Sequence, residues 1–101
     1  MDTFTALADP TRRRIVETLA AGEASFGQLA GRFELSLPAV SQHLKVLRDT
    51  GIVSARADAQ RRIYRLNDGS LDEFENWLRK LRDFWPRRLD RLEQLLEETD
   101  G

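Results

Sequence analysis

The side chains best suited to chemistry in this chain are hydrogen-bond donors on one short segment. Gln42 and Lys45 lie about one helical turn apart, among the small residues Pro38, Ala39 and Ser41. A helix with such a face is slim enough to enter the major groove of DNA. There, a glutamine amide can bond adenine at two atoms and so read sequence, whereas serine and lysine bind phosphate and position the protein. The alternative is that Gln42 is an ordinary exposed polar residue.

A second group of donors lies further along the chain, at Arg61 and Arg62. Cations at the tip of a hairpin can reach phosphates or the minor groove, and the alternative is a solvated pair of charges. Ser36 precedes the first group, where its hydroxyl can bind phosphate, cap a helix, or do both. The candidate DNA-binding residues are Ser36, Pro38, Ala39, Ser41, Gln42, His43, Lys45, Arg61 and Arg62.

The chain contains one His and no Cys, which restricts every other kind of chemistry. Without Cys there is no disulfide scaffold, no thiol nucleophile and no zinc site built on thiolates. His43 has two open interpretations: it donates to a phosphate or a base, or it closes the edge of the core. Tyr64 is open in the same way, between core packing and a DNA contact. Since no nucleophile is paired with a base, we expect that the protein is not an enzyme. We also expect no metal site and no cofactor, because thiolate ligands are absent and one His cannot form a multi-His site.

The net charge of −1 argues against nucleic-acid binding when it is taken alone, but the charges are unevenly distributed. Residues 32–65 carry seven basic and three acidic side chains, a net charge of +4. Residues 66–101 carry six basic and ten acidic side chains, a net charge of −4. Local potential steers an anionic partner, so the basic middle of the chain favours nucleic acid, with ordinary surface variation as the alternative.

Helix signals along the chain place the candidate donors on the last of three short helices. Asp9 followed by Pro10 predicts the first helix start. Ser25 and Gln28 have the spacing of a capping box for the second helix. Ser36 can cap the third, whose inward stripe at helical spacing is Val40, Leu44 and Leu47. Two strands are then expected, over Ile52–Ala57 and Arg62–Leu66, joined by residues 58–61.

The last expected element is a helix from Leu71 to about Glu98. Two rows of residues repeat every seven positions along it and together form the a/d seam of a coiled coil, in which Arg88 is the one polar residue. The first row is Leu71, Leu78, Trp85 and Leu92, and the second is Phe74, Leu81, Arg88 and Leu95. Such a helix would be roughly 40 Å long, whereas a domain of this size has a radius of gyration of about 13 Å. Part of it must therefore overhang, and its seam needs a further surface, most simply its copy in a dimer. Pro86 should kink or split it.

Four aromatic residues gather on this helix, and they allow two interpretations. Phe74, Trp77, Phe84 and Trp85 could form an effector pocket at the dimer interface, but plain dimer core is favoured because interfaces are enriched in such residues without any ligand. The predicted interface residues are Phe4, Leu7, Phe74, Trp77, Leu78, Leu81, Trp85, Leu89 and Leu92.

Helix, short turn, helix and β-hairpin is the element order of a winged helix-turn-helix. Over nearly its whole length the sequence resembles the ArsR/SmtB-type winged-helix repressors of bacteria and archaea. The most specific match is LPAVSQHLKVL at 37–47 followed by GIV at 51–53, which resembles the recognition helix and first wing strand. The opening ALADPTRRRI at 6–15 resembles the family's entry into its core helix, and RIYRL at 62–66 its second wing strand.

The resemblance implies a homodimer joined through its N- and C-terminal helices, with two recognition helices that read a partly palindromic operator. It also implies a repressor, in many members of its own operon, which releases DNA when an inducer binds. Two departures argue against a transition-metal sensor: Ser25 and Gly27 stand where the thiolates would be, and no His follows His43. A third departure is Ala59 at the wing tip, where the family often has Gly. Because Ala at a positive φ is costly, we expect the turn to place that angle at Asp58 or to open into a longer loop.

The expected fold class is mainly α with a small β-hairpin (α+β), a dimeric winged helix-turn-helix. Residues 1–101 form one domain, with 71–98 as a C-terminal dimerisation helix. The expected function is a sequence-specific dimeric repressor that binds double-stranded DNA at its own operator and senses no transition metal. Relief of repression is left open between dilution, a partner protein and a small molecule. The alternative, suggested by the net charge of −1 and the acidic last third, is a winged-helix protein-interaction module with little DNA binding. Since no apolar run approaches the ~18 residues of a membrane span and the start lacks the features of a signal peptide, we expect a cytoplasmic protein.

Overall fold

The structure is a computed structural model that describes residues 1–100, although the side chains of residues 85–90 and 98–100 are not described. It consists of two compact units, residues 1–71 and the part that begins at Asp72. The division falls at the residue where the C-terminal helix was expected to begin. The organisation as a single domain remains a prediction.

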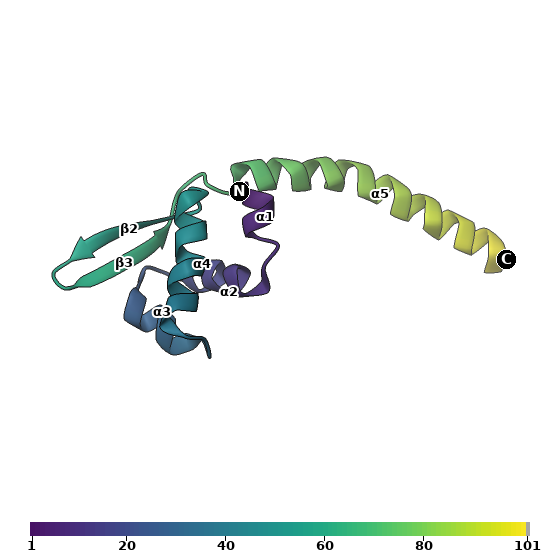
Figure 1. Ribbon diagram of the computed structural model, residues 1–101. Helices are drawn as coiled ribbons and strands as arrows, with labels where there is room; N and C mark the ends of the chain where they lie inside the picture. The colour runs from purple at the N-terminus through teal and green to yellow at the C-terminus, as the bar shows by residue number, and fades with distance from the viewer. Residues whose placement is uncertain (101) are drawn as a thin grey trace. The chain divides into compact units, whose positions relative to one another are not determined.

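The first unit has the predicted winged helix-turn-helix order, with helices on one side of a hairpin that projects from them (Figure 1). Its elements, in chain order, are α1 (Thr3–Ala6), α2 (Pro10–Ala20), β1 (Ala24–Ser25), α3 (Phe26–Arg32), α4 (Leu37–Asp49), β2 (Val53–Asp58) and β3 (Arg61–Leu66). The second unit is the single helix α5 (Asp72–Asp100). The fold class predicted from the sequence is confirmed.

The sheet in the described residues has the strand order β1-β3-β2, with both pairs antiparallel. The strand β1 was not predicted, since only a hairpin was expected. It pairs Ala24 with Tyr64 and Ser25 with Ile63, so it covers the second edge of β3. Two residues are too short to show the alternation of apolar and polar side chains that identifies a strand.

Helices α2, α3 and α4 begin at the side-chain caps that the sequence predicted. The carboxylate of Asp9 accepts a hydrogen bond from the backbone N–H of Arg12 at 3.0 Å. This bond is the main reason why the pKa of Asp9 lies below 3.8, its ordinary value. Ser25 and Gln28 form both bonds of the capping box, at 3.1 and 2.8 Å. Ser36 caps α4 by accepting from the N–H of Ala39 at 3.2 Å.

The core of the first unit forms around the inward face of α4. Val40, Leu44 and Leu47 are fully buried, which confirms the stripe predicted for this helix. The other residues of the buried core come from α1, α2, α3, β2, β3 and two loop positions, and they are Ala6, Ile15, Leu19, Leu29, Phe33, Ile52, Val53 and Tyr64. Tyr64 therefore packs in the core, the first of the two interpretations considered for it.

The tip of the wing is a tight turn, and the prediction for its backbone is wrong. Asp58 and Arg61 are paired strand residues, so only Ala59 and Gln60 remain to form the turn. A two-residue hairpin requires a positive φ at one or both of its central positions. Ala59 takes it, with a φ of 57°. Neither the longer loop nor a positive φ at Asp58 is found, because the strand pairing extends to Asp58.

The helix α5 runs from Asp72 to Asp100 without interruption, so Pro86 does not split it. A proline removes one helical hydrogen bond, and the seven-residue apolar repeat, which favours helix, continues on both sides of it. In the described part of the chain, no helix is long and apolar enough to span a bilayer.

The wing tip leads to a first testable prediction. Ala59→Gly should raise the free energy of unfolding by about 0.5–1 kcal/mol, since relief from a left-handed φ outweighs the extra flexibility that Gly gives the unfolded chain. The matched control is Ala57→Gly in the extended strand β2, which should lower it. Urea unfolding at a fixed protein concentration measures both. A loss of stability in both variants would show that Ala59 is not strained.

Candidate nucleic-acid interface

Most of the candidate DNA-binding residues lie at the N-terminal end and in the middle of α4, on its outward face. Ser36, Ser41, Gln42 and Lys45 are exposed, as is Pro38. Ala39 and His43 are half-buried. Since the opposite stripe is fixed in the core, the rotation of α4 about its own axis is set, and these polar side chains must face away from the core.

Lys45 forms an ion pair with Asp49 one turn further along α4, at 3.1 Å, with both side chains exposed. An exposed pair of this kind contributes little to stability, so its cation can exchange to another anion at small cost. The contact therefore orients the Lys45 ammonium along the helix but does not prevent it from binding another anion.

His43 lies against the start of α2. Its Nδ1 is 3.4 Å from a guanidinium nitrogen of Arg12 and 4.0 Å from the carboxylate of Asp9. Its side chain is 21% exposed. These contacts support the second interpretation of this residue, closure of the core edge, and leave only one ring nitrogen for any contact with DNA. That contact remains a prediction.

The two wing arginines differ in their surroundings. Arg61 pairs across the hairpin with the carboxylate of Asp58, at 3.2 Å and with both side chains exposed. Arg62 shares one face of the hairpin with Tyr64, because alternate residues of a strand point the same way. Among the described residues, Arg62 forms no ion pair.

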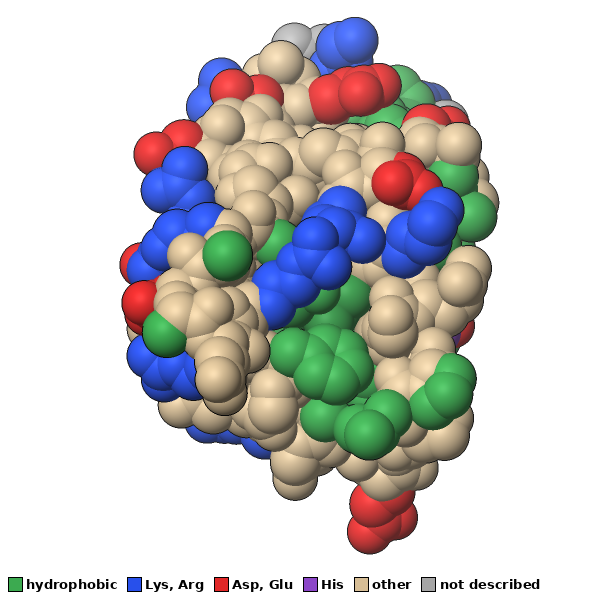
Figure 2. Space-filling model, turned by 60° about the vertical axis from the view of Figure 1, so that its left-hand side comes forward, with side chains coloured by type: hydrophobic (Ala, Val, Ile, Leu, Met, Phe, Trp, Pro, Cys, Tyr) green, Lys and Arg blue, Asp and Glu red, His purple; other side chains and the backbone are tan. Residues whose placement is uncertain are grey.

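A hollow joins α4 to the wing and brings candidates from both together. It is lined by Ser41 of α4, by Gln60, Arg61, Arg62 and Tyr64 of the wing, and by Ser25, Phe26 and Gly27. Seen with the wing side turned forward, the surface carries a band of Lys and Arg side chains beside a group of hydrophobic ones (Figure 2). Sequence reasoning missed Gln60, whose only signal was its place in the turn.

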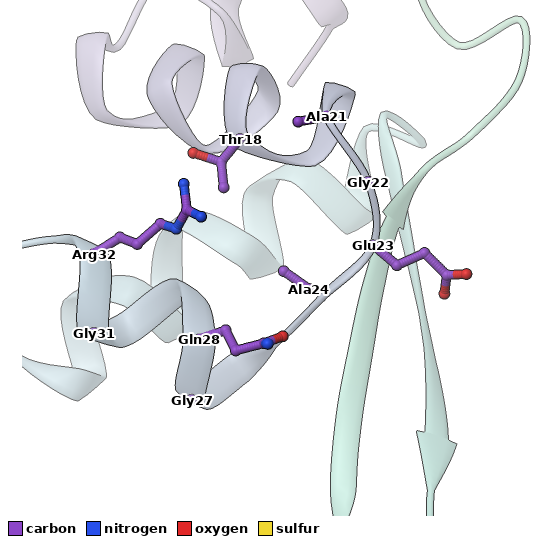
Figure 3. Close-up of a pocket in the computed structure, with 9 residues that line it drawn as sticks. All are labelled: Thr18, Ala21, Gly22, Glu23, Ala24, Gly27, Gln28, Gly31 and Arg32. Carbon is purple, nitrogen blue, oxygen red and sulfur yellow. The ribbon is translucent and has the colours of Figure 1, made fainter.

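A second hollow, which shares Gly27 with the first, lies between the end of α2 and α3 (Figure 3). Small residues form most of its wall, while Arg32 extends from α3 toward Thr18 and Glu23 points away on the other side. The carboxylate of Glu23 pairs with Arg56 of β2. None of the predicted DNA-binding residues lines this hollow.

The predicted dimer-interface residues fall into three groups. Phe4 and Leu7 of the first unit are half-buried, as are Phe74, Leu78 and Leu81 of α5. Trp77 and Leu92 are 45% and 55% exposed, and the rings of Phe74 and Trp77 lie 5.9 Å apart. The side chains of Trp85 and Leu89 lie outside the described residues.

Comparison with known proteins gives consistent matches over this architecture. The family model for bacterial regulatory proteins of the arsR family matches residues 9–55, from the cap of α2 into β2. The HTH-type transcriptional regulator Rv2034 of Mycobacterium tuberculosis is 45% identical over 92 residues, which cover 91% of this chain and 83% of that protein. The transcriptional repressor SdpR of Bacillus subtilis is 36% identical over 75 residues, which cover 74% and 83%.

A solved structure described as a possible transcriptional regulator for arsenical resistance superposes with a TM-score of 0.75. It is 40% identical, and the match covers 91% of this chain and 93% of that one. The chain belongs to the arsR family of bacterial regulatory proteins. As a member of the arsR family it is a DNA-binding transcriptional regulator and not an enzyme, and the resemblance found in the sequence is confirmed.

The ion pair at the wing leads to a second prediction. Asp58→Asn should strengthen binding to any DNA duplex about threefold, because it removes an anion that competes with phosphate for Arg61. The matched control is Glu75→Gln, which makes the same charge change at the exposed Glu75–Arg79 pair of α5, 3.3 Å long. Fluorescence anisotropy over a salt series measures both. An equal gain in the two variants would mean that only net charge matters.

Proposed function

We propose that this arsR-family regulator is a homodimeric repressor that binds a partly palindromic operator sequence-specifically and represses its own gene. The observation that carries the proposal is the outward face of α4, where Ser41, Gln42 and Lys45 are exposed beside the wing while the inward stripe is fully buried. The cytoplasm is the compartment where such a regulator meets DNA.

In the proposed complex, α4 lies in the major groove and each residue has a distinct role. Gln42 reads adenine through its amide, and the small side chains of Pro38 and Ala39 allow close approach to the base edges. Ser36, Ser41 and Lys45 bind phosphates. His43 adds a donor at the edge of the helix, and Arg61 and Arg62 carry the wing to the neighbouring backbone or minor groove.

Repression is supported by relatives that are themselves named as repressors. They include the SdpR protein and a biofilm growth-associated repressor of Agrobacterium fabrum. A bound dimer occupies the DNA that RNA polymerase needs, so no catalytic group is required of the protein. Binding to its own upstream DNA makes that repression autoregulatory.

The homodimer is proposed from the apolar side of α5. Leu92, a member of the a/d rows, is 55% exposed, and Leu96, one turn further along this helix of 29 residues, is 63% exposed. Two copies related by a two-fold axis present two α4 helices, which is why the operator is expected to be partly palindromic. The predicted interface, Trp85 and Leu89 included, is part of this proposal.

We infer that no transition metal controls the repressor. The chain contains no Cys, and its only His has Nδ1 against Arg12 and Asp9. Among the described residues, no three His, Cys, Asp or Glu side chains are placed to share a metal ion. The effector is therefore sought among small molecules or partner proteins.

The third prediction tests operator binding with labelled DNA from upstream of the chain's own gene and a scrambled duplex. The wild-type protein should bind the upstream duplex at least 100-fold more tightly and saturate at two chains per site. Gln42→Ala should reduce this preference about tenfold by removing a base contact. Added Zn²⁺ should leave the affinity unchanged.

Fluorescence anisotropy measures this preference, with Glu75→Gln on α5 as the control variant. Equal weak binding of the wild-type protein to both duplexes would contradict the proposal. It would favour the alternative of a protein-interaction module.

The fourth prediction concerns the dimer. Leu92→Asp should weaken self-association at least about tenfold, because a carboxylate replaces an apolar side chain in the seam. The matched control is Gln94→Asp, which introduces the same group two residues away, outside the a/d rows. Sedimentation equilibrium measures the dissociation constant of each. A wild-type protein that remains monomeric at concentrations that saturate DNA would contradict the homodimer.

A further inference from the structure

The side chain of Arg12 joins three elements of the first unit. It projects from the first turn of α2, where it is half-buried. Its guanidinium reaches two backbone carbonyls of α1 and the imidazole of His43 on α4. From the sequence, Arg12 is a solvated helix residue or a phosphate contact, and the proposed complex with DNA assigns it no role.

On one side, Arg12 satisfies the end of α1. Its Nε donates to the carbonyl of Ala6 at 2.6 Å, and an Nη donates to the carbonyl of Thr5 at 3.4 Å. The carbonyl of Thr5 also accepts from the N–H of Ala8 at 3.1 Å, so the bond from Arg12 matters most at Ala6, which is fully buried and ends the helix, where carbonyls lack a partner within the helix. These bonds therefore fix the guanidinium against α1.

On the other side, the second Nη of Arg12 lies 3.4 Å from Nδ1 of His43. A guanidinium has donors only, so Nδ1 must accept. The proton of the neutral imidazole is then on Nε2. The contact thus selects one tautomer of His43 and leaves Nε2–H as the ring's outward donor.

Asp9 closes the arrangement. Its carboxylate caps α2 by accepting from the N–H of Arg12 at 3.0 Å, and the same oxygen lies 4.0 Å from Nδ1 of His43. Asp9 and Arg12 are the charged groups that face the imidazole among the described residues. His43 directly follows Gln42, the base-reading candidate, so whatever orients its ring acts at the reading face.

We propose that Arg12 is a positioning residue for operator recognition: it holds the His43 imidazole in one tautomer and orientation and fixes the exposed face of α4 relative to α1. The role rests on the proposed function, since it concerns how α4 reads an operator. Arg12 itself contacts no DNA in this proposal and acts through His43.

Arg13 provides a matched control on the same helix. Its guanidinium donates to the carbonyl of Leu7 at 3.2 Å, so it too supports the end of α1. Among the described contacts it makes none to α4. A purely structural role for Arg12 would therefore resemble that of Arg13, whereas the positioning role belongs to Arg12 alone.

The fifth prediction first tests the contact without DNA. The chain has one His, so a long-range ¹H–¹⁵N NMR spectrum contains a single imidazole. In the wild-type and Arg13→Ala proteins the neutral ring should be the Nε2–H tautomer, and in Arg12→Ala it should become a mixture. Arg12→Lys should keep the fold, because an ammonium can still reach a carbonyl of α1, but should also give the mixture because it lacks the planar fork.

The second arm is a double-mutant cycle on DNA binding. Arg12→Ala and His43→Ala should each lower the preference for the upstream over the scrambled duplex by about tenfold, and the double variant should lose no more than either alone. Arg13→Ala should remain within about twofold of the wild-type protein. Far-ultraviolet circular dichroism confirms that each variant is folded.

Three outcomes would overturn the role of Arg12. They are an unchanged tautomer in Arg12→Ala, additive losses in the double variant, or an equal loss in Arg13→Ala. Equal binding of the wild-type protein to the two duplexes would instead overturn the operator proposal itself. The wild-type arm therefore separates failure of the proposed function from failure of this inference.

Discussion

Burial of one stripe of α4 is the constraint on which the rest of the candidate interface depends. Val40, Leu44 and Leu47 are fully buried in the core cluster of the first unit, so the helix cannot rotate without exposing three apolar side chains. Exposing them would cost about 1.5–3 kcal/mol each. The same stripe that stabilises the core therefore orients Ser41, Gln42 and Lys45 outward, on the face proposed to read DNA.

The distribution of charge along the chain is more informative than its net charge. The net charge is −1, yet the basic middle segment contains α4 and the wing, and several of its cations already have anionic partners within the protein. Exposed pairs such as Lys45–Asp49 and Arg61–Asp58 hold their cations in place at little energetic cost. In the proposed complex a phosphate replaces the carboxylate in each, so DNA binding would be coupled to the loss of internal ion pairs.

The parts of the structure that the sequence predicted are those governed by local rules. Caps at Asp9, Ser25 and Ser36, the inward stripe of α4 and the two long strands depend on residues within one or two turns of each other. The strand β1, the positive φ of Ala59 and the Arg12–His43 contact depend on pairing between distant segments. Arg12 and His43 are 31 residues apart, so no spacing pattern could reveal that they meet. The sequence left continuity through Pro86 open, because one lost hydrogen bond opposes the surrounding apolar repeat.

The central claim is that the outward face of α4 and the wing together bind DNA. Titration of the ¹⁵N-labelled protein with its upstream duplex, followed by amide chemical shifts, tests this most directly because every element reports separately. The account predicts that the largest changes fall on residues 36–45 and 58–64. Changes confined to α5, or spread evenly over the chain without a maximum on α4, would contradict it.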